Sequence, residues 1–276
     1  MTISHRIMSL AELRTVLDWA ADEGWNPGLD DANAFHAADP DGFVVAQDGH
    51  APVAAISVVN HSQRFAFLGL YICRPSYRGR GIGPGLWRAA IARAGSRTIG
   101  LDGVRDQQEN YARSGFERAG TTTRYSGHLP GELDPEIRRA NETDMQALVA
   151  LETKASGWSK PAYMRSWFSQ TVNRVTYVLG KNGNIDGCAT VRRCRTGAKI
   201  GPLVADGMET AKRLIAHAAA DFCTDLTIDV PSSSTQLDAL CRRLGFMAGF
   251  RTARMYRGNA CRLGSTLYAV ASLELG

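Results

Sequence analysis

A glycine-rich turn between an apolar run and an amphipathic segment is the feature that most constrains how this chain can fold. Residues 65–72 form an apolar run typical of a buried strand, and residues 86–94 carry apolar side chains at helical spacing. The turn between them contains Gly79, Gly81, Gly83 and Gly85. Such a turn exposes backbone N–H groups at a helix N-terminus, where the helix dipole favours an anion. The sequence therefore predicts a phosphate-binding turn, to which Arg78 and Arg80 add positive charge.

Two well-known phosphate-binding loops do not fit this turn. It lacks the Gly-Lys-Ser/Thr ending of a Walker A loop, and its glycines follow the pattern GxGxG rather than GxGxxG. Because short glycine motifs are weak signals, an ordinary glycine-rich turn stays open at this point.

The composition indicates a globular protein with one large domain or two domains of ordinary size. The chain has 276 residues, of which 44% are hydrophobic and 21% are charged. Its net charge of +5 is small for this length and suits an anionic small ligand as well as nucleic acid. Since no run of Lys or Arg resembles a nucleic-acid tail, we expect no nucleic-acid partner.

The cysteines and the apolar runs predict a cytoplasmic protein without a metal site. The six cysteines are scattered, with no CxxC pair and no clustering with histidine. Residues 1–6 have no long apolar run behind them, and no segment is apolar over the length of a membrane span. A reduced cytoplasmic compartment is the simplest account, and we expect no membrane partner.

The order of the predicted elements repeats between the two halves of the chain. Both halves are expected to run β-α-α-β-β-β-α-β-α-β, which favours a duplicated domain over a solenoid. Predicted strands lie at 5–8, 43–47, 53–59, 65–72, 98–102 and 116–125, and again at 136–140, 175–179, 185–191, 200–204, 226–230 and beyond 246. Predicted helices follow a capping box at Ser9 and Glu12 and cover 31–38, 86–94, 107–114, 161–168 and 208–222, with others after 141 and before 245. Hairpin turns are predicted at Asp48-Gly49 and Asn182-Gly183.

Residues 129–135 are the best candidate linker, because they gather Pro, Gly and acidic residues without periodicity. We therefore expect one domain over residues 1–128 and a second over 136–276. A strand-like stretch at 265–275 has no counterpart in the first half.

The first half resembles the GCN5-related N-acetyltransferases, or GNATs. The acetyl-CoA motif of that family is Arg/Gln-x-x-Gly-x-Gly/Ala between a central strand and a helix, and residues 78–83 fit it at every specified position. A later motif of the family, a Tyr four residues before Gly-Phe, is present as Tyr111 before Gly115-Phe116. Two motifs in the right order make this resemblance specific over residues 1–128.

The second half looks like a degenerate copy of the same fold. Residues 200–207 stand at the position of the phosphate turn without its motif, and Cys241 stands at the position of Tyr111. The whole chain is thus similar to bacterial tandem GNATs in which only the N-terminal copy keeps the cofactor motif. The resemblance implies an α/β (α+β) fold with two tandem GNAT-like domains, each a mixed, largely antiparallel sheet flanked by helices. It also implies an N-acetyltransferase that uses acetyl-CoA, and we expect a primary amine of a small molecule as the acceptor.

The resemblance further assigns roles to individual residues. The pyrophosphate of CoA is expected on the turn, and pantetheine is expected to pair with the preceding strand. The implied cofactor-binding residues are Leu70, Tyr71, Ile72, Arg78, Gly79, Arg80, Gly81, Ile82, Gly83 and Tyr111. The N–H of Ile72 is expected to stabilise the oxyanion, and Tyr111 to protonate the departing thiolate. Alternatively, Tyr111 is a packing tyrosine at a helix end.

The general base is the gap in this interpretation. The strand at 65–72 carries no acidic residue, where some relatives place a Glu. By topology the nearest carboxylates are Asp102 on the next strand and Glu23 in an early loop, although isolated carboxylates are more often solvated or structural. A water-mediated base, or no base, also stays open.

The acceptor site is expected near the early loop that contains Glu23, Trp25 and Asn26, unless Trp25 only packs that loop against the core. From the second half, Trp158, Arg192, Arg193 and Arg195 are further candidates for a cleft between the domains. The alternative for these arginines is a solvated face. The missing base keeps a second functional class open, a CoA-binding sensor or pseudoenzyme with vestigial activity.

Replacing Gly81 tests the predicted phosphate turn. Gly81→Glu puts bulk and negative charge where the backbone N–H groups are expected to hold phosphate, so we expect it to abolish CoA binding. Calorimetric titration with CoA measures this directly. Wild-type affinity in the variant would refute the placement of the site.

Overall fold

Each half of the chain follows the element order that the sequence predicts. The computed structural model describes residues 3–180, 184–261 and 263–276, so the predicted turn Asn182-Gly183 lies outside the described residues. The strands of the first half are β1 (Ile3–Ile7), β2 (Phe43–Asp48), β3 (Ala51–Asn60), β4 (Phe65–Cys73), β5 (Thr98–Val104) and β6 (Glu117–His128). Those of the second half are β7 (Ile137–Arg139), β8 (Arg174–Leu179), β9 (Gly187–Arg193), β10 (Ala198–Ala205), β11 (Asp225–Pro231), β12 (Met247–Arg257) and β13 (Leu267–Ala269).

The helices also repeat in pairs. They are α1 (Leu10–Asp22), α2 (Asp31–Ala38), α3 (Gly83–Ala94) and α4 (Gln108–Arg113), then α5 (Met145–Ser156), α6 (Pro161–Phe168), α7 (Met208–Asp221) and α8 (Thr235–Arg243). Short 3₁₀ turns precede three of them, at Pro75–Tyr77, Arg105–Gln107 and Glu142–Asp144. The capping box of α1 is confirmed, because Ser9 Oγ accepts from Glu12 N at 3.3 Å and Glu12 Oε2 accepts from Ser9 N at 2.9 Å. None of the described helices is long and apolar enough to cross a membrane.

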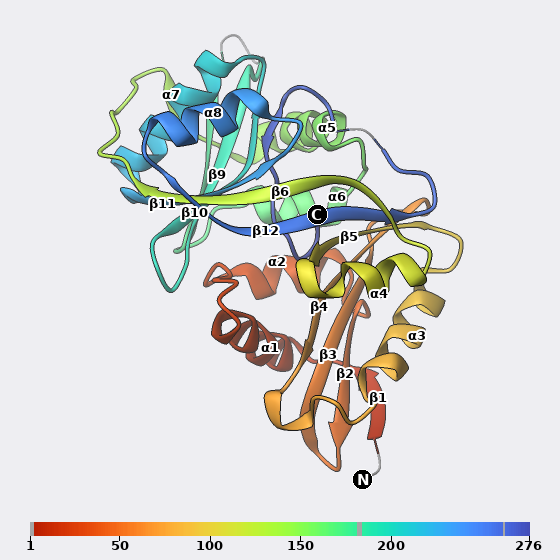
Figure 1. The fold of residues 1–276 in the computed structure, drawn as a ribbon. Coiled ribbons are helices and arrows are strands. Elements are labelled where there is room, and N and C mark those ends of the chain that lie inside the picture. The colour runs from red at the N-terminus through yellow and green to blue at the C-terminus, as the bar shows by residue number, and fades with distance from the viewer. Residues whose placement is uncertain (1–2, 181–183, 262) are drawn as a thin grey trace.

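One twisted sheet runs through both halves (Figure 1). Its strands lie in the order β1-β2-β3-β4-β5-β12-β6-β11-β10-β9-β8-β7, and β13 pairs with β10. Neighbouring strands are antiparallel except for β4 with β5 and β10 with β11. Helices α1, α2, α5 and α6 share one apolar core on one face, while α3 and α4 cover the other face in the first half and α7 and α8 cover it in the second.

Strands β6 and β12, which hold equivalent places in the two halves, each pair with the other half. Strand β6 belongs to the first half but pairs with β11, and β12 belongs to the second half but pairs with β5. The two exchanged strands also pair with each other, and Figure 1 shows β12 in blue along the yellow-green β6. We keep 129–135, which forms no helix or strand, as the proposed boundary along the chain. In space, however, each half completes the sheet of the other.

Two equivalent salt bridges hold the exchanged strands. Asp102 on β5 lies opposite Arg254 on β12, and Arg254 donates to its carboxylate at 2.6 and 3.0 Å. Asp229 on β11 lies opposite Arg124 on β6, with donor–acceptor distances of 2.7 and 2.8 Å. All four side chains are buried, and each arginine fork binds one carboxylate in the two-bond geometry that guanidinium favours.

The prediction of a strand over 265–275 is correct only for β13. Beyond Ala269 the chain leaves the sheet of the second half and crosses to the first half, where the backbone oxygen of Leu275 lies 2.9 Å from His61 Nε2. After Val270, which donates to the backbone oxygen of Asp229 on β11, the segment bonds mainly to side chains of both halves, which is why the extended pattern does not continue as a strand.

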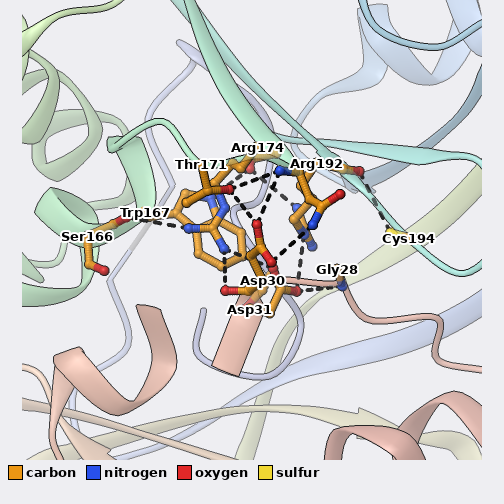
Figure 2. A network of polar contacts seen from close by, with 12 residues as sticks. Gly28, Asp30, Asp31, Ser166, Trp167, Thr171, Arg174, Arg192 and Cys194 are labelled. Carbon is orange, nitrogen blue, oxygen red and sulfur yellow. Dashed lines mark hydrogen bonds and ion pairs between the residues drawn. The ribbon is translucent and has the colours of Figure 1, made fainter. Parts of the chain in front are cut away.

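A second buried network joins α2 to the second half. The carboxylate of Asp31 accepts from Arg174 at 3.3 Å, from Arg192 at 3.2 Å and from the backbone of Gly28 at 2.7 Å. Both guanidinium groups also lie over the ring of Trp167, 4.4 and 4.7 Å from its centroid. Figure 2 shows these side chains converging on Asp31, which is fully buried. One carboxylate thus compensates much of the charge of two buried arginines.

Removing this carboxylate tests how strongly the network holds the halves together. We expect Asp31→Ala to lower the free energy of unfolding by about 3–5 kcal/mol, because it leaves buried guanidinium charge uncompensated. Urea unfolding followed by circular dichroism measures the change. The control is Asp41→Ala, an exposed aspartate for which we expect a change within about 0.5 kcal/mol. Equal effects of the two substitutions would contradict this role of Asp31.

Candidate active site

Strands β4 and β5 separate just before the glycine turn. Their parallel pairing covers Phe65↔Thr98 to Leu68↔Leu101 and then stops. Among the residues that the structure describes, β4 beyond Leu68 pairs only with β3, and the end of β5 pairs only with β12. One edge of β4 is therefore without a strand partner over residues 69–73, and an extended ligand can bind there as a strand would.

A bulge in β4 marks the point of separation. The register against β3 shifts between Ala55↔Ile72 and Ser57↔Gly69, so β4 carries one extra residue. Leu70 adopts a φ of +46°, a strained conformation for leucine that costs about 1–3 kcal/mol and is found mostly at functional sites. Because of the extra residue, the side chains after the bulge point to the opposite face of the sheet from the one that regular alternation would give. Leu68 packs under α3 and α4, whereas Leu70 and Ile72 pack on the side of α1 and α2.

The glycine turn leads from this open edge into α3. Gly79 and Gly81 both have a φ of +75°, which favours glycine, and a Cβ on either would meet no atom within 4 Å. Gly83, the first residue of α3, packs against the hydroxyl of Tyr71, so a Cβ there would collide with it. The turn borders an open outer pocket. Its lining residues are Glu23, Trp25, Tyr71, Ile72, Cys73, Tyr77, Arg78, Gly79, Gly81, Ile82, Gly83, Pro84, Val104, Asp106, Gln107 and Phe250.

The two arginines of the turn are already engaged. Arg78 donates to the backbone oxygen of Cys73 at 2.9 Å and forms an ion pair with Glu23. Arg80 lies over the ring of Tyr77, 5.0 Å from its centroid. The pair with Glu23 places that predicted acceptor residue at the outer pocket.

Tyr111 projects from α4 into the region between β4 and β5. Its ring stacks on Trp87 at 5.3 Å and lies over Gly103, where a Cβ would come within 3.0 Å of the ring. Burial, with a contribution from Tyr71, raises the pKa of the Tyr111 phenol above its ordinary value. The hydroxyl is therefore protonated at neutral pH and available as a hydrogen-bond donor.

Tyr111 lines an inner pocket that adjoins the outer one. The two pockets share Trp25, Tyr71, Val104, Gln107 and Phe250. The inner pocket is further lined by Leu68, Gly69, Leu70, Leu101, Asp102, Tyr111, Arg124, Thr252, Leu273 and Glu274. Four of the lining residues belong to the second half, namely Phe250 and Thr252 on β12 and Leu273 and Glu274 beyond β13. No motif in the sequence indicates these four, and the only signal for the last two is the unmatched stretch at 265–275.

Asp102 lines the inner pocket but its carboxylate is occupied. Burial raises the pKa of this carboxyl, and the charge and hydrogen bonds of Arg254 oppose the rise. Taking a proton from a substrate would break the salt bridge that holds β12 to β5. The geometry therefore favours a structural role for Asp102.

The other predicted acceptor residues lie at the contact between the halves. Trp25 lines both pockets, and its backbone oxygen accepts from Arg124 and Lys199, each at 2.8 Å. Asn26 lines neither pocket. Its side chain bonds in both directions to the backbone of Thr196 in the second half, at 2.9 and 3.3 Å. The early loop is thus fixed against the second half.

Trp158, Arg192, Arg193 and Arg195 do not line the pocket that contains Tyr111. Trp158 stacks on Phe65 at 4.2 Å, and Arg192 is buried in the Asp31 network. Arg193 and Arg195 are exposed, and Arg195 forms ion pairs with two aspartates of α1. The alternative of a solvated face thus describes Arg193 and Arg195 but not Arg192.

In the second half the equivalent separation of strands is filled by the chain itself. Strands β10 and β11 pair from Ala198↔Leu226 to Ile200↔Ile228 and then diverge. Between them β13 pairs with β10 at Leu203↔Ala269, and the next residue, Val270, donates to the oxygen of Asp229 at 3.2 Å. An extended ligand finds no free strand edge there. The described residues also contain no group of three or more His, Cys, Asp or Glu placed to hold a metal ion.

Comparison with known proteins gives the family. Residues 10–118 match the model of the Acetyltransferase (GNAT) family, and residues 148–269 match that of the Acetyltransferase (GNAT) domain. Over 280 aligned residues the chain is 32% identical to holothin acyltransferase of Pseudoalteromonas sp. (strain SANK 73390), covering 100% of this chain and 95% of the relative. The chain is a tandem-domain GNAT protein. The resemblance that residues 78–83 and Tyr111 predicted is confirmed, and this tandem GNAT is an enzyme of the acyltransferase class.

More distant relatives share the fold along most of the chain. The tandem GNAT is 26% identical over 219 residues to the uncharacterized N-acetyltransferase YitH of Bacillus subtilis (strain 168), covering 77% of each protein. The crystal structure of a putative acetyltransferase from Pyrococcus horikoshii superposes with a TM-score of 0.85 at 18% identity, covering 99% of this chain and 96% of the other. A tandem GNAT protein from the clavulanic acid biosynthesis pathway gives a TM-score of 0.63 at 16% identity, covering 94% and 100%.

Proposed function

We propose that this tandem GNAT transfers an acetyl group from acetyl-CoA to a primary amine of a small molecule. The observation that carries the proposal is the meeting of three features in adjoining pockets, namely the unpaired edge of β4, the glycine turn and Tyr111. Peptide-like amides of pantetheine suit a free strand edge, and the pyrophosphate suits the N–H groups at the start of α3. The likeness to holothin acyltransferase supports acyl transfer as the reaction class.

In this proposal the steps at the thioester fall to residues of the first half. A neutral amine attacks the thioester carbonyl, and the negative charge that develops on its oxygen needs a fixed donor. The candidate from the sequence is the N–H of Ile72. However, Arg74 N donates to Val53 O on β3, and Ile72, two residues earlier in the same register, also turns its N–H toward β3. An N–H of the bulge just before Ile72, on the edge of β4 without a strand partner, suits this role better. As the C–S bond breaks, the thiolate accepts a proton from Tyr111, whose burial keeps the phenol protonated until then.

A CoA-binding sensor or pseudoenzyme is the second candidate. It is favoured by the absence of a carboxylate on β4 and by the engagement of Asp102 with Arg254. Release of thiol from acetyl-CoA across a panel of primary amines separates the two candidates. Tight CoA binding without product from any amine would favour the sensor.

Removing the hydroxyl of Tyr111 tests the proposed acid. We expect Tyr111→Phe to lower the single-turnover rate of acetyl transfer by about 10²-fold, the effect typical of one general acid. Rapid-quench measurement of acetylated product gives this rate. The control is Tyr268→Phe, which removes a phenol that lines neither pocket. An unchanged rate in Tyr111→Phe would remove Tyr111 from the mechanism.

The occupied strand edge in the second half leads to a prediction about the stoichiometry of CoA binding. Because β13 occupies the edge of β10, we expect calorimetric titration to give one CoA per chain. In Gly81→Glu we expect no binding at all, since the single site lies in the first half. Two equivalents of CoA per wild-type chain, or one residual equivalent in the variant, would contradict this assignment.

A further inference from the structure

The segment after β13 carries residues of the second half into the active site of the first. Several contacts with buried side chains fix its course. Ser272 Oγ accepts from the hydroxyl of Tyr163 at 3.1 Å, and the oxygen of Gly276 accepts from Lys160 at 2.5 Å. His61 Nε2 lies 2.9 Å from the oxygen of Leu275. The residue between these anchors, Glu274, is only 4% exposed.

Gly69 is what lets this segment reach the point where β4 and β5 separate. The backbone oxygen of Glu274 lies so close to Gly69 that any Cβ at that position would collide with it. Gly69 directly follows the last residue of β4 that pairs with β5, and it precedes the bulge at Leu70. Glu274 is therefore held beside the strand edge where the thioester is expected.

In the inner pocket, Glu274 carries the carboxylate that is not already engaged. Glu274 lines the inner pocket together with Leu70, Tyr71 and Tyr111. Among the described residues, none forms a hydrogen bond or ion pair with its carboxylate, whereas the carboxylate of Asp102 is held by Arg254. A buried carboxylate without a hydrogen-bond donor is costly, so a carboxylate in this position points to a ligand that supplies one.

The cations near Glu274 are bound elsewhere. Arg124, Arg192 and Lys199 lie close enough to interact with it electrostatically. Arg124 is paired with Asp229, Arg192 with Asp31, and Lys199 donates to the backbone oxygen of Trp25. None of them makes a hydrogen bond to Glu274, so its carboxylate oxygens are open to a donor from the pocket, such as an ammonium group.

We propose that Glu274 binds the ammonium group of the acceptor and removes its proton, which rests on the acetyltransferase function proposed above. An alkylammonium with a pKa of about 10.4 is almost fully charged at neutral pH and cannot attack. Transfer of one proton to Glu274 frees the nitrogen lone pair, which forms the C–N bond to the thioester carbonyl as the C–S bond breaks. Sulfur takes a proton from Tyr111, which solvent then replaces. Glu274 passes its first proton to solvent and accepts the second from the amide nitrogen.

The same pocket indicates the kind of acceptor. Apart from Glu274 its open surface is largely apolar and aromatic, with Trp25, Leu68, Phe250 and Leu273 among the lining residues. One carboxylate in such surroundings suits one ammonium group on an apolar or aromatic body. A polycation would leave its other charges without partners. The acceptor class is therefore a basic monoamine with an apolar body, of which phenethylamine is a simple representative.

The test compares Glu274→Gln with the wild type on two amines of similar shape. Phenethylamine is an ammonium ion at neutral pH, whereas aniline is already neutral and needs no base before attack. We expect the substitution to lower kcat/KM for phenethylamine by about 10²-fold and to change the rate with aniline much less. CoA affinity should stay at the wild-type value. Added formate should restore part of the phenethylamine activity in Glu274→Ala.

Each other outcome has a definite meaning. The matched control is Glu142→Gln, an exposed glutamate of the second half for which we expect wild-type rates. Equal losses with both amines would show that Glu274 has only a structural role. Unchanged rates with phenethylamine would show that it takes no proton, and higher rates would show that it obstructs the site. Any of these results overturns the role of Glu274 alone. A wild-type enzyme that acetylates no amine would overturn the acetyltransferase proposal as well. Preference for spermidine over phenethylamine would overturn the acceptor class.

Discussion

The buried pairing of Asp102 with Arg254, and of Asp229 with Arg124, is the interaction on which the rest of this structure depends. It fixes β6 and β12 each in the sheet of the other half, so that β12 becomes the neighbour of β5 on the side away from β4. That strand brings Phe250 and Thr252 to the wall of the inner pocket. Without β12 beside β5, the pocket would lack this wall.

The two halves show the same backbone arrangement put to opposite uses. In each, two central parallel strands pair at their start and then diverge beside a register shift. The first half leaves the resulting edge open next to a glycine turn. The second half lacks that turn and fills the edge with β13. The second half lacks the cofactor motif but still contributes to the proposed site. The segment that fills the gap between β10 and β11 continues into the pocket of the first half.

The sequence predicts what local signals encode. The element order, the capping box of α1 and the glycine turn all depend on residues close together in the chain, and they could be predicted because local spacing determines them. The exchange could not be predicted, because β6 and β12 follow equivalent Gly-Phe pairs and either could have completed its own half. Glu274 belongs to a stretch without motif or counterpart. Its place in the pocket depends on long-range contacts with His61, Lys160 and Tyr163 that no spacing reveals.

The strand exchange also determines when during synthesis the site can form. A ribosome makes β5 long before β12, so the first half emerges with an unpaired strand edge, the kind of surface that invites aggregation or wrong pairing. Pairing β12 with β5 joins residues roughly 150 positions apart in the sequence, and such distant contacts form slowly. The glycine turn and Tyr111 are made early, but the pocket beside them stays incomplete until residue 274 has been made. The nascent first half is thus a partial binding site that cannot yet carry out the proposed reaction.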